Sequence, residues 1–181
     1  FYGFDKPWYQ QYVIQMGNLV RGELGYSFKY PNRTVNGVIG EAAPVSLELG
    51  VYALTVSLGL GLIAGILASL KPNTMLAYIP SSLSMIGICL PTFLLGPVLI
   101  LVFTLKLEWF PLAGWSTPAS KVLPAITLGL YYSAYVARLA RGGMRDVLSQ
   151  DFIRTARAKG ATETRVILKH AIKGGIIPVV S

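Results

Sequence analysis

Three long stretches without an ionisable side chain constrain the fold of this chain more than any other feature of its sequence. Residues 49–70, 73–105 and 122–137 contain no Asp, Glu, Lys, Arg or His. A helix rises about 1.5 Å per residue, so the first stretch covers the roughly 30 Å hydrocarbon core of a bilayer. We expect an all-α transmembrane fold with three spans. The second is tilted or kinked, and the third crosses only if Lys121 and Arg138 extend their charged ends to the two surfaces.

Two patterns within these stretches bear on packing. Gly61 and Gly65 lie four residues apart, a spacing that lets membrane helices approach closely. We interpret them as a helix-packing motif, with contact to a substrate as the alternative. Pro91 and Pro97 lie inside the second stretch and predict a bent helix, which either lines a transport path or is a purely structural kink.

The distribution of charge orients the spans. Charged residues make up only 13% of the chain, and 16 Lys and Arg against 8 Asp and Glu give a net charge of +8. Nine of the cations lie between residues 138 and 173, directly after the third stretch, where the positive-inside rule expects a cytoplasmic loop. This placement, without a nucleic-acid-binding motif, argues against nucleic acid as a partner.

The orientation defines two regions. We expect residues 1–46, with a short helix near 7–20 and a turn at 29–33, to form an extracytoplasmic lead-in. Residues 47–181 are expected to form one membrane domain, with its 106–121 loop outside. We expect this domain to be incomplete, because the chain does not open with Met and its last apolar stretch stops at the chain end.

The basic region after the third stretch predicts two helices around a glycine. Ser149 or Asp151 is expected to cap the first helix, Gly160 to end it, and Thr162 to begin the second. The stretch from Gly174 to Pro178 is then expected to break this unit. The unit is either an amphipathic element on anionic lipid or a docking element for another protein.

Particular residues of this region resemble a known family. The sequence Arg154-Thr-Ala-Arg-Ala-Lys-Gly160, followed by Leu168-Lys-His-Ala171 and Ile177-Pro178, resembles the cytoplasmic EAA loop of binding-protein-dependent ABC importer permeases. Its acidic-Ala-Ala start reads Arg154-Thr-Ala156 here, as in the dipeptide and oligopeptide branch, and specifically its B-type oligopeptide permeases. Other stretches resemble the same branch: residues 22–30, 44–47 and 123–124.

The resemblance implies a type I ABC importer permease fold in which residues 146–178 form an EAA-type coupling loop. In that family a short coupling helix seats in a groove on the ATP-hydrolysing subunit. The coupling residues it implies are Arg154, Thr155, Ala156, Arg157, Gly160 and His170. Arg154 and Arg157 either pair with acidic groups of the partner or form a solvated basic face.

The resemblance also implies a function and partners. The chain would be a transmembrane permease subunit of an ATP-driven dipeptide or oligopeptide importer, multi-pass in the cell inner membrane. Its partners would be a second permease subunit, ATP-hydrolysing subunits, an extracytoplasmic peptide-binding protein and the lipid bilayer. Alternatives are a same-family permease for nickel, glutathione or another small solute, or a membrane scaffold or channel.

The residues themselves argue against catalysis by this chain. The phosphate-binding pattern Gly-x-x-x-x-Gly-Lys-Ser/Thr is missing from the sequence, so ATP binding is expected on another polypeptide. Cys89 is the only cysteine and no Cys/His cluster accompanies it. We therefore expect no enzyme activity, no cofactor and no metal site.

Overall fold

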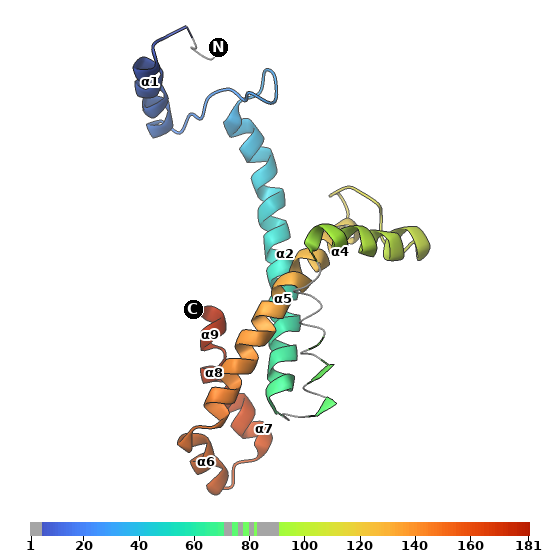
Figure 1. The fold of residues 1–181 in the computed structure, drawn as a ribbon. Helices are drawn as coiled ribbons and strands as arrows, with labels where there is room; N and C mark the ends of the chain where they lie inside the picture. The colour runs from blue at the N-terminus through green and yellow to red at the C-terminus, as the bar shows by residue number, and fades with distance from the viewer. Residues whose placement is uncertain (1–4, 71–73, 76–77, 80–81, 83–90) are drawn as a thin grey trace. The chain divides into compact units, whose positions relative to one another are not determined.

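The computed structural model describes residues 5–70, 74–75, 78–79, 82 and 91–181, and helices dominate these ranges (Figure 1). The expectation of an all-α fold is confirmed. Within the described part, β-type backbone pairing occurs only at an isolated bridge between Tyr26 and Thr34. The chain forms two compact units, Phe1–Glu48 and Leu49–Ser181, which are described separately.

The first unit begins with helix α1, Trp8–Val20, close to the expected 7–20. Gly22 and Gly25 both have positive φ, and they reverse the chain after the helix. Asn36 fixes this reversal, because its Oδ1 accepts from the Leu24 N–H at 2.8 Å and its Nδ2 donates to the Gly22 carbonyl at 2.5 Å. The side chain of one asparagine therefore supplements the main-chain pairing of the loop.

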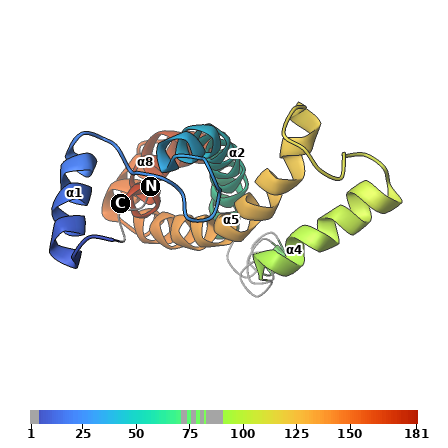
Figure 2. The same cartoon turned by 90° about the horizontal axis from the view of Figure 1, so that it is seen from above.

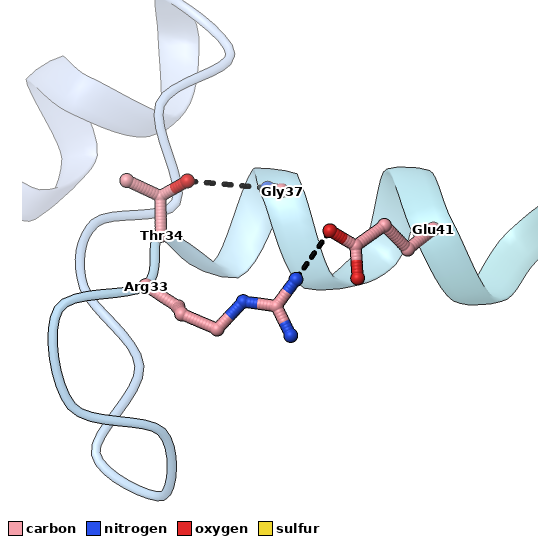
Figure 3. A network of polar contacts seen from close by, with 4 residues as sticks. All are labelled: Arg33, Thr34, Gly37 and Glu41. Atoms are coloured by element: carbon pink, nitrogen blue, oxygen red, sulfur yellow. Dashed lines mark hydrogen bonds and ion pairs between the residues drawn. The ribbon is translucent and has the colours of Figure 1, made fainter.

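Helix α2, Val35–Leu70, begins in the first unit. Thr34 Oγ1 accepts from the Gly37 N–H at 3.2 Å, which satisfies one of the free donors of the first turn (Figure 3). The Arg33 guanidinium forms an ion pair with Glu41 beside it. The helix has 36 residues and starts well before the uncharged stretch at 49–70, because charged residues near its start do not interrupt helical backbone.

The second unit contains most of the apolar chain. Helices α2 and α5, Pro118–Leu148, are each long and apolar enough to cross a membrane. The expected third span over residues 122–137 is thus too short. Thr117 caps α5 by accepting from the Ser120 N–H at 3.4 Å, and the helix continues past Arg138 for a total of 31 residues. The helix is about 46 Å long, but its uncharged part is still residues 122–137, so Lys121 and Arg138 remain the residues expected to snorkel.

The expected second span is described only in part. Helix α4, Thr92–Leu99, is followed by a π-helical stretch, Ile100–Lys106, and together they form a shorter apolar helix. Pro97 lies inside α4 as expected, but Pro91 does not lie inside a helix, because its φ of −59° and ψ of 140° are extended. Residues 83–90, including Cys89, lie outside the described residues.

Helices α2 and α5 meet through small residues. Gly61 and Gly65 are buried on α2, as are two more small residues at the same spacing, Ala53 and Ser57. A Cβ at Gly65 would lie 2.5 Å from the Ala137 carbonyl oxygen, and one at Gly61 would lie 2.8 Å from the Ser133 carbonyl oxygen. The backbones of the two helices therefore touch, which confirms the helix-packing interpretation of this spacing.

Candidate functional site

The 146–178 segment folds into short helices at the end of α5 (Figure 1). After Leu148 the chain forms helix α6 and then turns at Gly160. The elements are α6 (Asp151–Ala158), α7 (Glu163–Arg165), a π-helical stretch (Val166–Ala171), α8 (Ile172–Gly175) and α9 (Ile177–Val180). The helix–glycine–helix arrangement expected from sequence is present.

The start of α6 differs from the expectation. Gln150, with ψ of 153°, occupies the N-cap position, and its side chain makes no capping bond. Ser149 is not the cap because its Oγ donates to the Asp146 carbonyl at 2.7 Å. Asp151 is the first helical residue, where its carboxylate stabilises the helix through the dipole.

The end of α6 confirms the role expected of Gly160. Its φ is +80°, in the left-handed region that favours glycine. The Gly160 N–H donates to the Arg157 carbonyl at 2.9 Å, and the Ala161 N–H donates to the Ala156 carbonyl at 3.2 Å. These two bonds form a Schellman motif, which closes the helix and redirects the chain. Thr162 is then the N-cap of α7, where the second helix was expected to begin.

A small hydrophobic core holds α6 against α5. Ile153 of α6 and Val166 of the π-helical stretch are fully buried, as is Met144 of α5. The complete core consists of Met144, Val147, Ile153, Val166 and Ala171, with Ile66 of α2 packed against it. Helix α2, helix α5 and the 146–178 segment therefore share one packed cluster.

The structure separates the six expected site residues by environment. Arg154, Thr155, Arg157 and Gly160 are exposed on α6 and its turn. Ala156 is half-buried and packs against the core, so its small side chain serves the inner face of α6. His170 is half-buried on a different element, the π-helical stretch.

The two arginines of α6 have different partners within the chain. Arg157 Nε lies 2.7 Å from Glu163 Oε1 and its Nη2 lies 3.2 Å from Glu163 Oε2, a bidentate pair. This hydrogen bonding raises the pKa of Arg157 and lowers the pKa of Glu163. Arg154 lies 3.5 Å from Asp151 within α6, and its side chain is 75% exposed. Glu163 is a residue that the sequence reading missed, because a separation of six across a turn is not a helical spacing.

Glycines join α8 to α5 after the segment turns back. A Cβ at Gly143 would lie closer to the Gly175 carbonyl oxygen than the 3.0 Å that real Cβ atoms keep, and one at Gly175 would lie 2.5 Å from Met144 Sδ. Figure 2 shows α8 beside α5. Gly174 and Gly175 lie inside α8. The break expected over residues 174–178 is present, because α8 ends at Gly175, the chain turns at Ile176 and α9 begins at Ile177.

The segment carries exposed charged side chains outside its small core. Among the residues that the structure describes, no three His, Cys, Asp or Glu side chains group closely enough to hold a metal ion. Its helix α6 is basic and largely exposed, and Ile153 packs this helix into the small core.

Comparisons with known proteins identify the family. Residues 58–181 match the family described as binding-protein-dependent transport system inner membrane component. The chain is 43% identical over 182 residues to the oligopeptide transport system permease protein OppB of Haemophilus influenzae, covering 99% of this chain and 60% of that protein. It is 41% identical over 182 residues to OppB of Escherichia coli strain K12, with the same coverage.

A dipeptide permease is similar as well. The dipeptide transport system permease protein DppB of Bacillus subtilis is 38% identical over 181 residues, covering 100% of this chain and 59% of that protein. The chain thus spans about three fifths of the length of these relatives. The match over residues 58–181 includes α5 and the whole 146–178 segment, and the chain belongs to the family of inner membrane components of binding-protein-dependent transport systems.

Proposed function

We propose that this chain is a transmembrane permease subunit of an ATP-driven peptide importer, and that α6 couples it to an ATP-hydrolysing subunit. One observation carries the coupling proposal. Helix α6 presents Arg154 and Thr155 in exposed positions, while Ile153 anchors the helix in a core shared with α5. A partner that moves α6 therefore moves a candidate membrane span with it, because packed interiors transmit displacement.

The peptide substrate is supported by the relatives, all three of which are named as oligopeptide or dipeptide permeases. The proposed partners are a second permease subunit, ATP-hydrolysing subunits and an extracytoplasmic peptide-binding protein. In the proposed multi-pass topology residues 1–46 are extracytoplasmic, and residues 47–181 form the membrane domain with the 146–178 segment in the cytoplasm. The excess of cations after residue 138 supports this orientation.

Substitution of Gly160 tests the coupling proposal. We expect Gly160→Trp to abolish uptake of radiolabelled trialanine by cells that express the full-length subunit, because a backbone φ of +80° is strained for a bulky L-residue and the turn beside α6 is disturbed. The amount of subunit in the membrane fraction should stay unchanged. Gly160→Asn should retain uptake, since asparagine tolerates left-handed backbone.

Gly114 provides the matched control. Its φ is +113°, also in the left-handed region, but it lies in the loop before α5, far along the chain from α6. Gly114→Trp should leave trialanine uptake close to wild type. Undiminished uptake in the Gly160→Trp variant would contradict the coupling proposal.

A further inference from the structure

The turn between α6 and α7 is open on its outer side. A Cβ at Gly160 would meet no atom within 4 Å, so no side chain packs over the glycine. The Schellman bonds fix the backbone up to Ala161, and the next main-chain bond, from the Val166 N–H to the Thr162 carbonyl at 2.9 Å, lies within the following turn. The direction of α7 relative to α6 must therefore be set by contacts between side chains.

Two sets of side chains are placed to do this. Ile153 and Val166 lie in the buried core, and they hold the two elements together at a distance from the turn. Arg157 follows Ile153 by four residues, on the same face of α6, and Glu163 precedes Val166 by three. The ion pair thus lies one helical turn nearer to Gly160 than the core on both sides, and it extends the contact of the core out to the turn.

The geometry of the pair suits a directional role. Two N–H···O bonds to the two carboxylate oxygens, at 2.7 and 3.2 Å, fix the guanidinium plane relative to the carboxylate, which a single contact cannot do. The side chains are 42% and 63% exposed, and exposed ion pairs contribute little to overall stability. The Arg154–Asp151 contact at 3.5 Å joins two residues of one helix, so it places no constraint on α7.

We propose that Arg157 is a positioning residue whose bidentate pair with Glu163 sets the angle between α6 and α7. Through this angle it sets the direction in which α6 presents Arg154 to the ATP-hydrolysing subunit; the second step rests on the proposed function. Arg157 then acts within the chain, and Arg154 is the arginine that faces the partner.

The first experiment measures the angle itself, independently of transport. Spin labels at Phe152 and Lys169, both exposed, report the separation of α6 from the π-helical stretch in the full-length subunit without other cysteines, by double electron–electron resonance in nanodiscs. Arg157→Glu places like charges across the turn and should shift or broaden the distance distribution. Arg154→Glu, with the same change of charge, should not. An unchanged distribution in Arg157→Glu would overturn the inference, whatever happens to transport.

The second experiment measures coupling in the complete transporter reconstituted in liposomes, as ATP hydrolysed per trialanine transported. Arg157→Glu should raise this ratio between about twofold and about thirtyfold, which corresponds to a loss of about 0.5–2 kcal/mol of coupling free energy. Combination with Glu163→Arg should restore it. Combination with Asp151→Arg, which restores the net charge but not the pair, should not.

The outcomes separate the two proposals. Failure of the Glu163→Arg swap to restore the ratio would show that Arg157 acts as a cation toward the partner, and would refute its positioning role. A changed distance distribution together with normal uptake in Gly160→Trp would keep the positioning role and refute the coupling function.

Discussion

Gly142 and Gly143 are neighbours on α5, yet the structure predicts opposite effects when each is replaced by alanine. An added Cβ at Gly142 meets no atom within 4 Å. At Gly143 it would overlap the Gly175 carbonyl oxygen and lie 3.1 Å from Pro178 Cδ and Cγ. The two substitutions make the same change in helix propensity. The difference in stability between the two variants therefore reports how closely α8 and α9 approach α5.

The expected magnitudes follow from two terms. Alanine favours a helix interior over glycine by about 0.8–1 kcal/mol, so Gly142→Ala should stabilise the subunit by up to about 1 kcal/mol. Gly143→Ala has the same gain, but overpacking costs about 1–3 kcal/mol. The upper part of this range applies, because the obstacle is a main-chain oxygen that moves only if α8 moves. The net loss is about 1–2 kcal/mol.

The assay is thermal unfolding of the purified full-length subunit in a single detergent. The two variants differ by about 2–3 kcal/mol, which corresponds to about 4–12 °C in the midpoint of unfolding. Gly142→Ala should unfold at or above the wild-type temperature and Gly143→Ala below it. If Gly143→Ala is as stable as Gly142→Ala, the close approach of α8 to α5 is refuted.

Two further predictions concern the segment around α6. Ile153→Ala removes a fully buried side chain from the small core and should cost about 2–5 kcal/mol in the stability of α6, whereas Phe152→Ala, at a position 46% exposed, should change it by about 0.5 kcal/mol or less. Hydrogen exchange of the α6 amides measures both, and equal protection in the two variants would contradict the core. Because folding lowers the pKa of Glu163, its ion pair with Arg157 contributes to stability at pH values above the ordinary pKa of 4.5. This contribution is lost as the pH falls through the lower pKa that Glu163 has in the folded chain. The Phe152–Lys169 spin-label distribution should therefore broaden only below pH 4.5, and a wild-type response equal to that of Arg157→Gln would argue against this titration.

Features set by local chemistry were predictable from the sequence. Helix α1 was expected to within one residue, and Gly160 ends α6 with the positive φ that only glycine adopts easily. The spacing of Gly61 and Gly65 indicated close helix packing, because the missing Cβ atoms on an apolar helix face let a second helix approach closely. Each of these signals depends on the backbone preferences of one or two residues.

Features set by the environment were not predictable in the same way. The bounds of α2 and α5 were missed because an uncharged stretch marks only the most apolar part of a helix and not its ends, and α5 continues past Arg138 to Leu148. The packing role of Gly175 was missed because its partner, Met144, lies about thirty residues earlier and is brought close only by the fold. The pairing of Arg157 with Glu163 was also missed, because the two side chains come together only where the chain turns at Gly160.

The contact between Gly143 and Gly175 has a mechanical consequence. The chain leaves α5 at Leu148 and returns to it at Gly175, so the loop that carries α6 is anchored at both ends to one short length of helix. Contacts between long side chains can deform by changes of rotamer. Direct contact between two main chains deforms much less. In the proposed importer, a load applied to α6 would therefore reach α5 and the chain beyond Ile177 together, with little of the displacement lost on the way.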